Sequence, residues 1–313
     1  MSILERETAA DSAVRRRGRP LADRPGWLGA FMIAPAVLYI VLVVGMPFVL
    51  ALYYSVSDIT AGSRSLNFVG LKNFADIVST GQFRTALRNT FVFAVVSQVI
   101  VLVGANVLAL ALMRDFRGKW LVRLLLLLPW VAPISLGTIG WLWILDSIYS
   151  VINWTLEALG LIRPNDWPMW LGIPHLAMGS VIMVHVWRLL PLATIILLAG
   201  LSSIPKEIHE AARVDGAGFW RQHFRITLPL VRPIMLVALL FGLVFAFTDM
   251  IVIFVLTRGG PYDTTQVLSS LAFFTGIQGG DLATGAAIAV FLFPLLLAVA
   301  VMFLRVARRT EVT

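Results

Sequence analysis

Six apolar stretches, each close to the length that crosses a lipid bilayer, dominate the sequence. A helix needs about 20 consecutive apolar residues to span the hydrocarbon core. The stretches lie at 27–54, 87–113, 121–146, 176–201, 233–257 and 283–305. The chain is 59% apolar and 13% charged, whereas soluble domains carry roughly 25% charged residues. Because one soluble core cannot bury so much apolar surface, we predict an all-α membrane protein with six transmembrane helices.

The distribution of Lys and Arg predicts the side of the membrane that each loop faces. Eighteen of these residues lie in the two tails, in the segment 114–123 and in the loop between the fourth and fifth stretches, and six lie in the opposite loops. Cytoplasmic loops carry the excess of basic residues. We therefore expect both termini in the cytoplasm, with a basic N-terminal tail at 1–26, a six-span domain at 27–305 and a short C-terminal tail at 306–313.

Several other classes are disfavoured by the same composition. The net charge of +8 arises from basic clusters beside apolar stretches, which is typical of membrane topology and not of nucleic-acid binding. Arg15, Arg16 and Arg17 could begin a secretory signal, but the following stretch is too long and no clear cleavage site follows, so an uncleaved anchor is favoured. The absence of Cys excludes disulfides and thiolate chemistry.

A polar loop at about 203–232 separates the fourth and fifth stretches. It is long enough to form helices of its own. Glu210 to Arg213 is rich in small residues and predicts a short helix, and Asp215-Gly216 predicts a turn because Gly tolerates positive φ. We expect two short helices at an angle, facing water. A helix hairpin lying on lipid headgroups is the alternative, since Phe219, Trp220 and Phe224 are apolar.

With its flanking spans, this loop resembles the EAA loop of binding-protein-dependent ABC transporter permeases. The matching loop residues are Glu210, Ala211, Ala212, Asp215, Gly216, Ala217, Phe224, Leu228, Pro229 and Pro233. Outside the loop, the resemblance rests on Phe68-Val69-Gly70-Leu71, Leu128-Pro129-Trp130, Leu198-Ala199-Gly200-Leu201 and Thr257-Arg258-Gly259-Gly260-Pro261. Together they cover about 68–290 and resemble the carbohydrate-uptake (MalF-like) branch, which implies the type I ABC importer permease fold.

The resemblance implies a multi-subunit transporter in a prokaryotic cytoplasmic (inner) membrane. The partners it implies are a second permease subunit in a heterodimer, two copies of an ABC ATPase, an extracytoplasmic solute-binding protein and membrane lipid. Glu210, Ala211, Ala212, Asp215, Gly216 and Ala217 would couple the chain to the ATPase, which would bind ATP and Mg²⁺. The chain itself has no phosphate-binding loop, since its Gly118-Lys119 pair is followed by Trp120, so we expect neither an enzyme nor a cofactor site here.

Ionisable side chains inside the apolar stretches are candidates for a solute pathway. Such a side chain at membrane depth costs at least roughly 2.5–3.5 kcal/mol, so it tends to face a cavity or a partner. His185 and Arg188 share one helical face, and Asp249 in the next stretch could neutralise Arg188. The resemblance places sugar-contacting positions at Trp130, His185, Arg188, Phe245 and Asp249, with residue types that differ from those of the maltose permease.

Structural roles are the alternative for each pathway residue. Trp130 could be an interfacial anchor, His185 an interhelical hydrogen bonder, and Arg188 with Asp249 a purely structural ion pair. An ion-coupled secondary transporter could use the same charges, but it leaves the 203–232 loop unexplained. A membrane-embedded enzyme is poorly supported, because the chain has neither a His-Glu-x-x-His nor a Gly-x-Ser-x-Gly pattern. The solute itself stays open among sugars, polyols and glycerol phosphodiesters.

Overall fold

The computed structural model describes residues 25–63, 66–164 and 166–310. The predicted N-terminal tail therefore lies almost wholly outside the described residues. The chain divides into two compact units, Met1–Tyr53 and Tyr54–Thr313. The described part of the first unit is α2 (Pro25–Ile40), a π-helical turn η2 (Val41–Gly45) and most of α3 (Met46–Ser55). This apolar run contains the first predicted span, because Gly29–Ser55 is long and apolar enough to cross a membrane.

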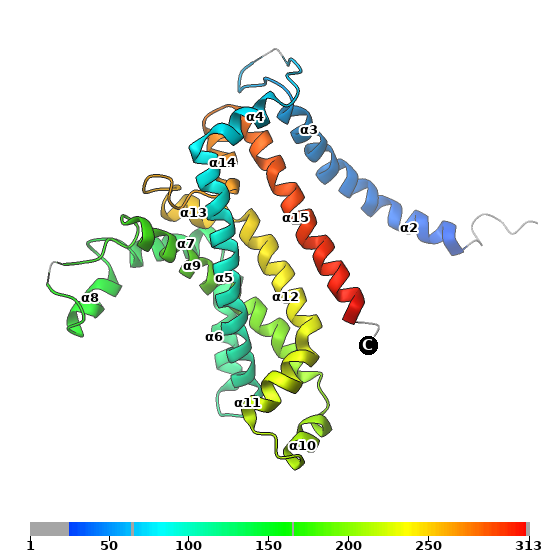
Figure 1. Ribbon diagram of the computed structural model, residues 1–313, viewed down its shortest axis with the longest axis vertical. Coiled ribbons are helices and arrows are strands. Elements are labelled where there is room, and N and C mark those ends of the chain that lie inside the picture. Colours follow the sequence, from blue (N-terminus) through cyan, green and yellow to red (C-terminus); the bar gives the residue numbers. More distant parts are fainter. Residues whose placement is uncertain (1–24, 64–65, 165, 311–313) are drawn as a thin grey trace, which may run out of the picture. The chain divides into compact units, whose positions relative to one another are not determined.

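The second unit is built around long helices that pack side by side (Figure 1). The long helices are α5 (Gly81–Met113), α9 (Pro174–Ser202), α12 (Leu228–Thr248) and α15 (Leu282–Thr310). Each belongs to a segment long and apolar enough to span a membrane. With Gly29–Ser55, these account for five of the six predicted spans in the described part of the chain.

The remaining predicted span, the third (121–146), is bent and not straight. It consists of α6 (Lys119–Val131) and α7 (Ile134–Ile144), which meet at 98°. Ala132 precedes Pro133 and has an extended backbone (φ −62°, ψ 140°), because the proline ring disfavours helical conformation in the residue before it. The local sequence therefore sets the bend.

The fifth predicted span is also interrupted. α12 ends at Thr248, and the short helix α13 (Ile251–Leu256) follows after Asp249 and Met250. On its other side, α12 is continuous with α11 (Phe219–Gln222) and the π-helical turn η3 (His223–Thr227). Pro229 and Pro233 lie in the first turns of α12, where each lacks the N–H group that would bond to the preceding turn. The backbone stays helical despite these missing hydrogen bonds, and a single helical segment runs from Phe219 to Thr248.

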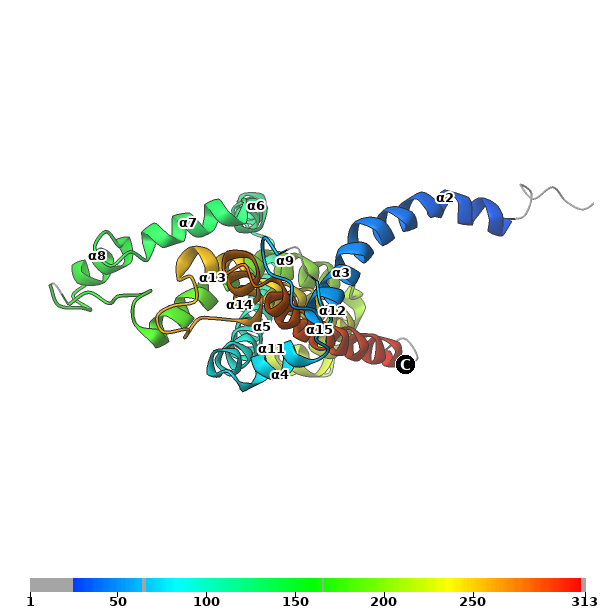
Figure 2. The ribbon, with the colours of Figure 1, turned by 90° about the horizontal axis from the view of Figure 1, so that it is seen from above.

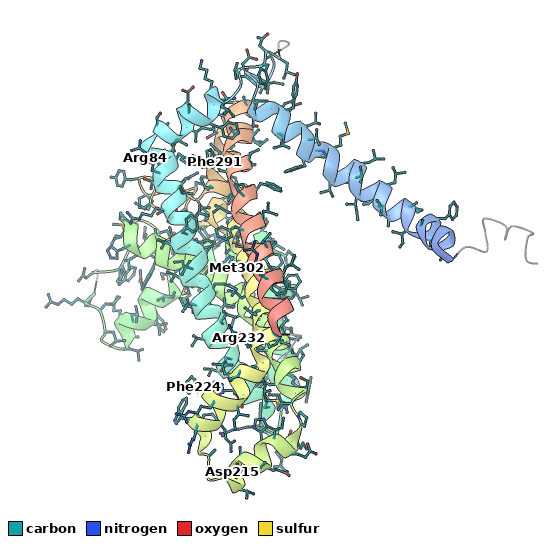
Figure 3. All side chains as sticks on the ribbon, turned by 45° about the vertical axis from the view of Figure 1, so that its right-hand side comes forward. Arg84, Asp215, Phe224, Arg232, Phe291 and Met302 are labelled. Atoms are coloured by element: carbon teal, nitrogen blue, oxygen red, sulfur yellow. The ribbon has the colours of Figure 1, made fainter. Side chains whose placement is uncertain are left out.

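Short helices complete the second unit. They are α4 (Lys72–Ser79), α8 (Val151–Ala158), α10 (Lys206–Val214), α14 (Leu268–Phe273) and the π-helical turn η4 (Phe274–Gln278). Figure 3 shows Asp215, which follows α10, at one end of the unit, and Arg84 near the other. The predicted polar loop is therefore far from α4 and the start of α5.

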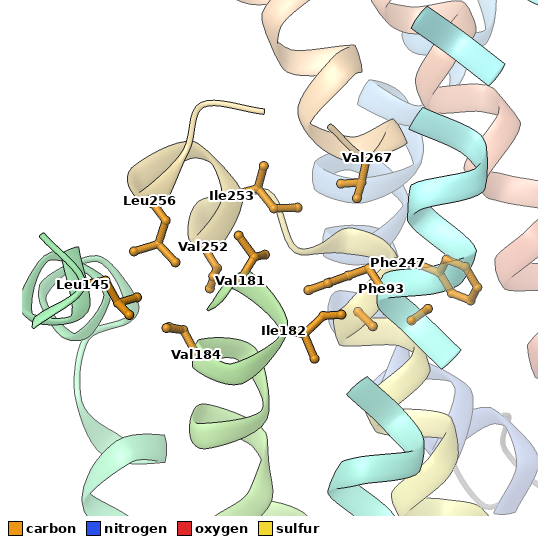
Figure 4. Close-up of a cluster of buried hydrophobic side chains, with 12 residues drawn as sticks. Phe93, Leu145, Val181, Ile182, Val184, Phe247, Val252, Ile253, Leu256 and Val267 are labelled. Carbon is orange, nitrogen blue, oxygen red and sulfur yellow. The ribbon is translucent and has the colours of Figure 1, made fainter. Parts of the chain in front are cut away.

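A buried apolar cluster joins the middle of the helix bundle to α13 (Figure 4). It includes Phe93 of α5, Val181 and Val184 of α9, Phe247 of α12 and Ile253 of α13. Figure 4 also shows Leu145, from the end of α7, directed toward this cluster. The interrupted fifth span is thus packed firmly against its neighbours on both sides of its break.

Candidate functional site

The break between α12 and α13 places a buried carboxylate inside the bundle. Asp249 leaves the helical conformation (φ −69°, ψ 110°), and its Oδ1 accepts a hydrogen bond from the backbone N–H of Val252 at 3.2 Å. Its own backbone carbonyl accepts a hydrogen bond from Ser269 Oγ at 2.9 Å. Since side chain and backbone are both held, Asp249 has a defined orientation.

Two side chains of α9 meet this carboxylate. The Nδ1 of His185 lies 2.7 Å from Asp249 Oδ2, and Arg188 Nη1 lies 3.5 Å from the same oxygen. The predicted pairing of Arg188 with Asp249 is therefore present. One turn of helix separates His185 from Arg188, so both reach the same oxygen.

The side chain of His185 is more deeply buried than we expect of a residue that contacts solute. Its side chain is fully buried, and its ring packs edge to face against Phe93 with centroids 4.7 Å apart. Its Nε2 is buried without a hydrogen-bond partner. The structural alternative named for His185, an interhelical hydrogen bond, is observed, and the full burial of the side chain favours this role.

An aromatic ring lies beside the guanidinium group of Arg188. Its guanidinium carbon lies 5.9 Å from the centroid of the Phe245 ring, and Phe245 packs edge to face with Trp130 at 5.5 Å. The Arg188 side chain is 15% exposed, whereas that of Asp249 is 2% exposed. Of this ion pair, Arg188 is the member that a passing solute could reach.

The structure thus joins all five predicted pathway residues into one continuous series of contacts. It runs from Trp130 through Phe245, Arg188 and Asp249 to His185. Guanidinium donors beside aromatic faces suit a polyhydroxylated ligand, whose hydroxyls accept hydrogen bonds and whose C–H faces stack on rings. We expect contact with solute of Trp130, Phe245 and Arg188, and the deeper burial of Asp249 and His185 favours a supporting role for these two.

Gln98 is a polar residue at membrane depth that the sequence interpretation missed. It lies in α5 and is 2% exposed, and neither its Nε2 nor its Oε1 has a hydrogen-bond partner among the residues that the structure describes. The amide lies against the backbone of Gly242 in α12, where a Cβ would collide with it. The sequence could have identified Gln98, because a polar side chain inside a predicted span tends to face a partner or a cavity, as was argued for His185 and Arg188.

The 203–232 loop forms a second candidate site. α10 carries the exposed Glu210 and ends in a turn in which Gly216 has φ +73°. The turn is closed by hydrogen bonds from the Gly216 and Ala217 amides to the carbonyls of Arg213 and Ala212, at 3.0 and 2.9 Å. The predicted helix and glycine turn are therefore confirmed.

The second helix of this loop is not a separate short helix. α11 begins at Phe219 and continues through η3 into α12, so the loop outside the long helices is shorter than 203–232. The predicted second short helix is present as α11, but it is not separated from the next span, because Gln222 to Thr227 keep a helical backbone up to Leu228. α10 is consequently connected, through one glycine turn, to a continuous helical segment that reaches Thr248.

An open groove lies between α10 and the α11–η3 segment. Its volume is about 550 Å³. The residues that line it are Ile208, Ala211, Ala212, Asp215, Ala217, Arg221, Arg225 and Ile226. Four of the six predicted coupling residues therefore face this groove, and Glu210 and Gly216 are exposed beside it.

Comparison with known proteins identifies the family. A family described as the binding-protein-dependent transport system inner membrane component matches residues 101–312. The chain belongs to this permease family. With its several apolar helices, the permease is a multi-pass membrane protein.

Relatives of this permease include proteins named as sugar transport components. The trehalose/maltose transport system permease protein MalF of Thermococcus litoralis is 32% identical over 288 residues, which cover 92% of this chain and 96% of the relative. The trehalose transport system permease protein SugA of Mycobacterium tuberculosis is 31% identical over 306 residues, which cover 97% and 95%. The predicted family resemblance is confirmed by these similarities.

Solved structures share the fold of the permease. A chain in the crystal structure of a bacterial alginate ABC transporter, in complex with an alginate pentasaccharide-bound periplasmic protein, matches with a TM-score of 0.78. It is 23% identical, and the match covers 91% of this chain and 95% of that one. The predicted importer-permease fold is thereby confirmed.

Proposed function

We propose that this permease is the membrane subunit of an ATP-driven importer that carries a sugar or a related solute across the cytoplasmic membrane. The family supplies the transport role, and the relatives named for trehalose and maltose favour a carbohydrate. Disaccharides, oligosaccharides, polyols and glycerol phosphodiesters are the candidate solutes. The observation that carries the mechanism is the short path along the chain from α10, through the turn at Gly216 and the continuous Phe219–Thr248 helical segment, to Asp249.

In this proposal α10 is the contact with the motor. Two copies of a separate ATPase subunit bind ATP and Mg²⁺, and one of them receives α10 with its exposed Glu210. Val214, at the end of α10, is 88% exposed, as expected of a surface that awaits a partner. Movement of the ATPase subunits would displace α10, and α11–α12 would carry this displacement to the break at Asp249.

The solute pathway in this proposal lies between this permease and a second, similar subunit. An extracytoplasmic binding protein delivers the solute, and Arg188 with Phe245 and Trp130 provides polar and aromatic contacts on this side of the pathway. His185 and Asp249 hold Arg188 in position. An ion-coupled carrier is the rival function, because the same three charged side chains could move protons.

Cysteine protection tests the docking surface directly, since the chain has no Cys of its own. Val214→Cys should react with a maleimide in the permease pair alone and become protected when the ATPase is bound. Asp115→Cys, in the loop between α5 and α6, is the matched control and should react in both states. Equal reactivity of Val214→Cys with and without the ATPase would show that α10 is not the docking surface.

Transport by the assembled complex tests the energy source. The permease pair, ATPase and binding protein should be reconstituted in vesicles and offered labelled trehalose and maltose as probes. We expect uptake to require ATP and to stop when the ATPase is omitted. Uptake without the ATPase, driven by a proton or sodium gradient, would favour the secondary carrier.

A further inference from the structure

The segment 146–170, which joins α7 to α9 and contains α8, buries the polar side chains of Ser150 and Asn153 and exposes several large apolar side chains. Its charged residues Arg163 and Asp166, which follow α8, are exposed as well. Asn153 of α8 is fully buried. Its Oδ1 accepts a hydrogen bond from Trp170 Nε1 at 2.8 Å, and its Nδ2 donates one to the Pro168 carbonyl at 3.3 Å. The side chain of Asn153 is therefore a buried polar centre, around which Trp170 and Pro168 are held.

Other polar side chains of this segment are satisfied internally as well. Ser150 Oγ donates to the Ile144 carbonyl at 2.7 Å, and Glu157 Oε2 accepts from Trp167 Nε1 at 2.5 Å. Thr155, which lies on the outer side, donates its hydroxyl to the Val151 carbonyl one turn earlier at 2.7 Å. A polar group needs a partner within the protein where the surrounding solvent cannot supply one.

The outer face of α8 is apolar. Val151 is 62% exposed and Trp154 is 68% exposed. Large apolar side chains before and after the helix are also exposed: Ile148, Tyr149, Leu159 and Leu161. α10 has the opposite pattern, because its exposed side chains include Lys206, Glu207, Glu210 and Arg213. The outer face of α8 is thus suited to apolar surroundings, whereas that of α10 is suited to water.

The position of α8 in the second unit agrees with its apolar outer face. Figure 1 shows α8 abreast of the long helices of the second unit, not beyond α4 and α14 at its end. In the view from above, α6, α7 and α8 follow one another away from α5 and α12 (Figure 2). Exposed apolar side chains continue along this path, with Val131 at the end of α6 and Leu136 and Trp143 on α7. Exposed apolar side chains are thus found on α6, α7 and α8 in turn, and α6 with α7 is a candidate bent membrane span.

We propose that α8 and its flanking turns are a lipid-embedded arm of the permease, with the Trp154 face against phospholipid at the boundary between headgroups and acyl chains. Tyr149 and Trp154 are the residue types that gather at this boundary. Arg163, which is exposed after α8, provides a cation for the phosphate of the same lipids. This proposal rests on the membrane location of the permease and does not depend on its coupling to an ATPase.

Quenching by spin-labelled lipid tests the proposal in the assembled complex. Trp154→Cys is labelled with an environment-sensitive fluorophore, and the complex is placed in nanodiscs of phosphatidylcholine with or without a nitroxide near the top of the acyl chain. Since the proposal puts position 154 beside lipid, its fluorescence should fall by roughly half or more. Tyr262→Cys is the matched control; Tyr262 is 90% exposed in the loop after α13 and should be quenched far less.

Three results would overturn the proposal. Position 154 could be quenched no more than position 262, it could crosslink to the second permease in place of contacting lipid, or it could react freely with an impermeant maleimide from water. A second pair of variants gives an independent readout: Trp154→Leu should keep the thermal stability of the complex in nanodiscs, whereas Trp154→Glu should lower it. Equal stability of the two variants would also contradict a lipid contact.

Discussion

Asp249 and His185, which are 64 residues apart in sequence, share a buried contact of 2.7 Å between Oδ2 and Nδ1. The contact joins the break of one membrane-spanning segment to the middle of another. Arg188 lies 3.5 Å from the same oxygen, so three ionisable side chains meet at one point inside the bundle. Their mutual dependence is the basis of the first two predictions.

Arg188 and Asp249 should be energetically coupled. Arg188→Ala or Asp249→Ala leaves one buried charge without its counter-ion, so each should lower the free energy of unfolding by about 3–5 kcal/mol and sharply reduce uptake. The double variant should lose less than the sum of the two, because neither charge then remains. Thermal unfolding and uptake in vesicles measure both effects; strictly additive losses would mean that the two side chains do not form a functional pair.

His185 should act through Asp249 and not by touching solute. His185→Ala removes a buried donor and the packing against Phe93, so we expect a loss of roughly 1–3 kcal/mol in the free energy of unfolding. Uptake should fall in proportion to this loss while the apparent KM for solute stays close to that of the native permease. A raised KM with unchanged stability would instead assign His185 a direct contact with solute.

Gly216 should be intolerant of proline because of its backbone. Its φ is +73°, whereas proline fixes φ near −65°. Gly216→Pro should therefore disrupt the turn after α10 and abolish solute-stimulated ATP hydrolysis in the assembled complex. Gly216→Asn is the control, since Asn tolerates this conformation, and it should retain most of the activity. Normal coupling in the proline variant would contradict the role proposed for α10.

The predicted topology can be tested with two exposed positions, Tyr262 and Asp115. Tyr262→Cys should react with an impermeant maleimide from outside the intact cell, whereas Asp115→Cys should react only after the membrane is permeabilised. The physical reason is the excess of basic residues on the side of α10. Reaction of position 262 only from the cytoplasmic side would reverse the assignment.

Gly242 should be required for the close approach of α5 and α12. A methyl group there would collide with the buried amide of Gln98, so Gly242→Ala should destabilise the permease by about 1–3 kcal/mol. Gln98→Ala should relieve most of this loss when the two changes are combined. Gly179→Ala in α9 is the control, because a Cβ there meets nothing within 4 Å; a similar loss in this control would rule out the specific collision.

Some features of this permease follow from the sequence alone because they depend on local chemistry. Hydrophobicity and length determine the spans, since the bilayer requires long apolar helices. The Asp215-Gly216 pair sets the turn after α10. The bend between α6 and α7 also depends on local chemistry at Pro133, although we did not predict it from the sequence. The pairing of Arg188 with Asp249 also followed, because the cost of a lone charge in the membrane demands a partner.

Other features were decided only by the tertiary structure. The burial of His185 against Phe93, the unpartnered amide of Gln98 and the inward-facing Asn153 depend on which helices meet and at what depth. The continuity of α11 with α12 likewise depends on packing, because His223 and Thr227 are buried in the structure although they lie in a polar stretch of sequence. A sequence records which side chains need partners, but contacts between distant segments determine which partners they find.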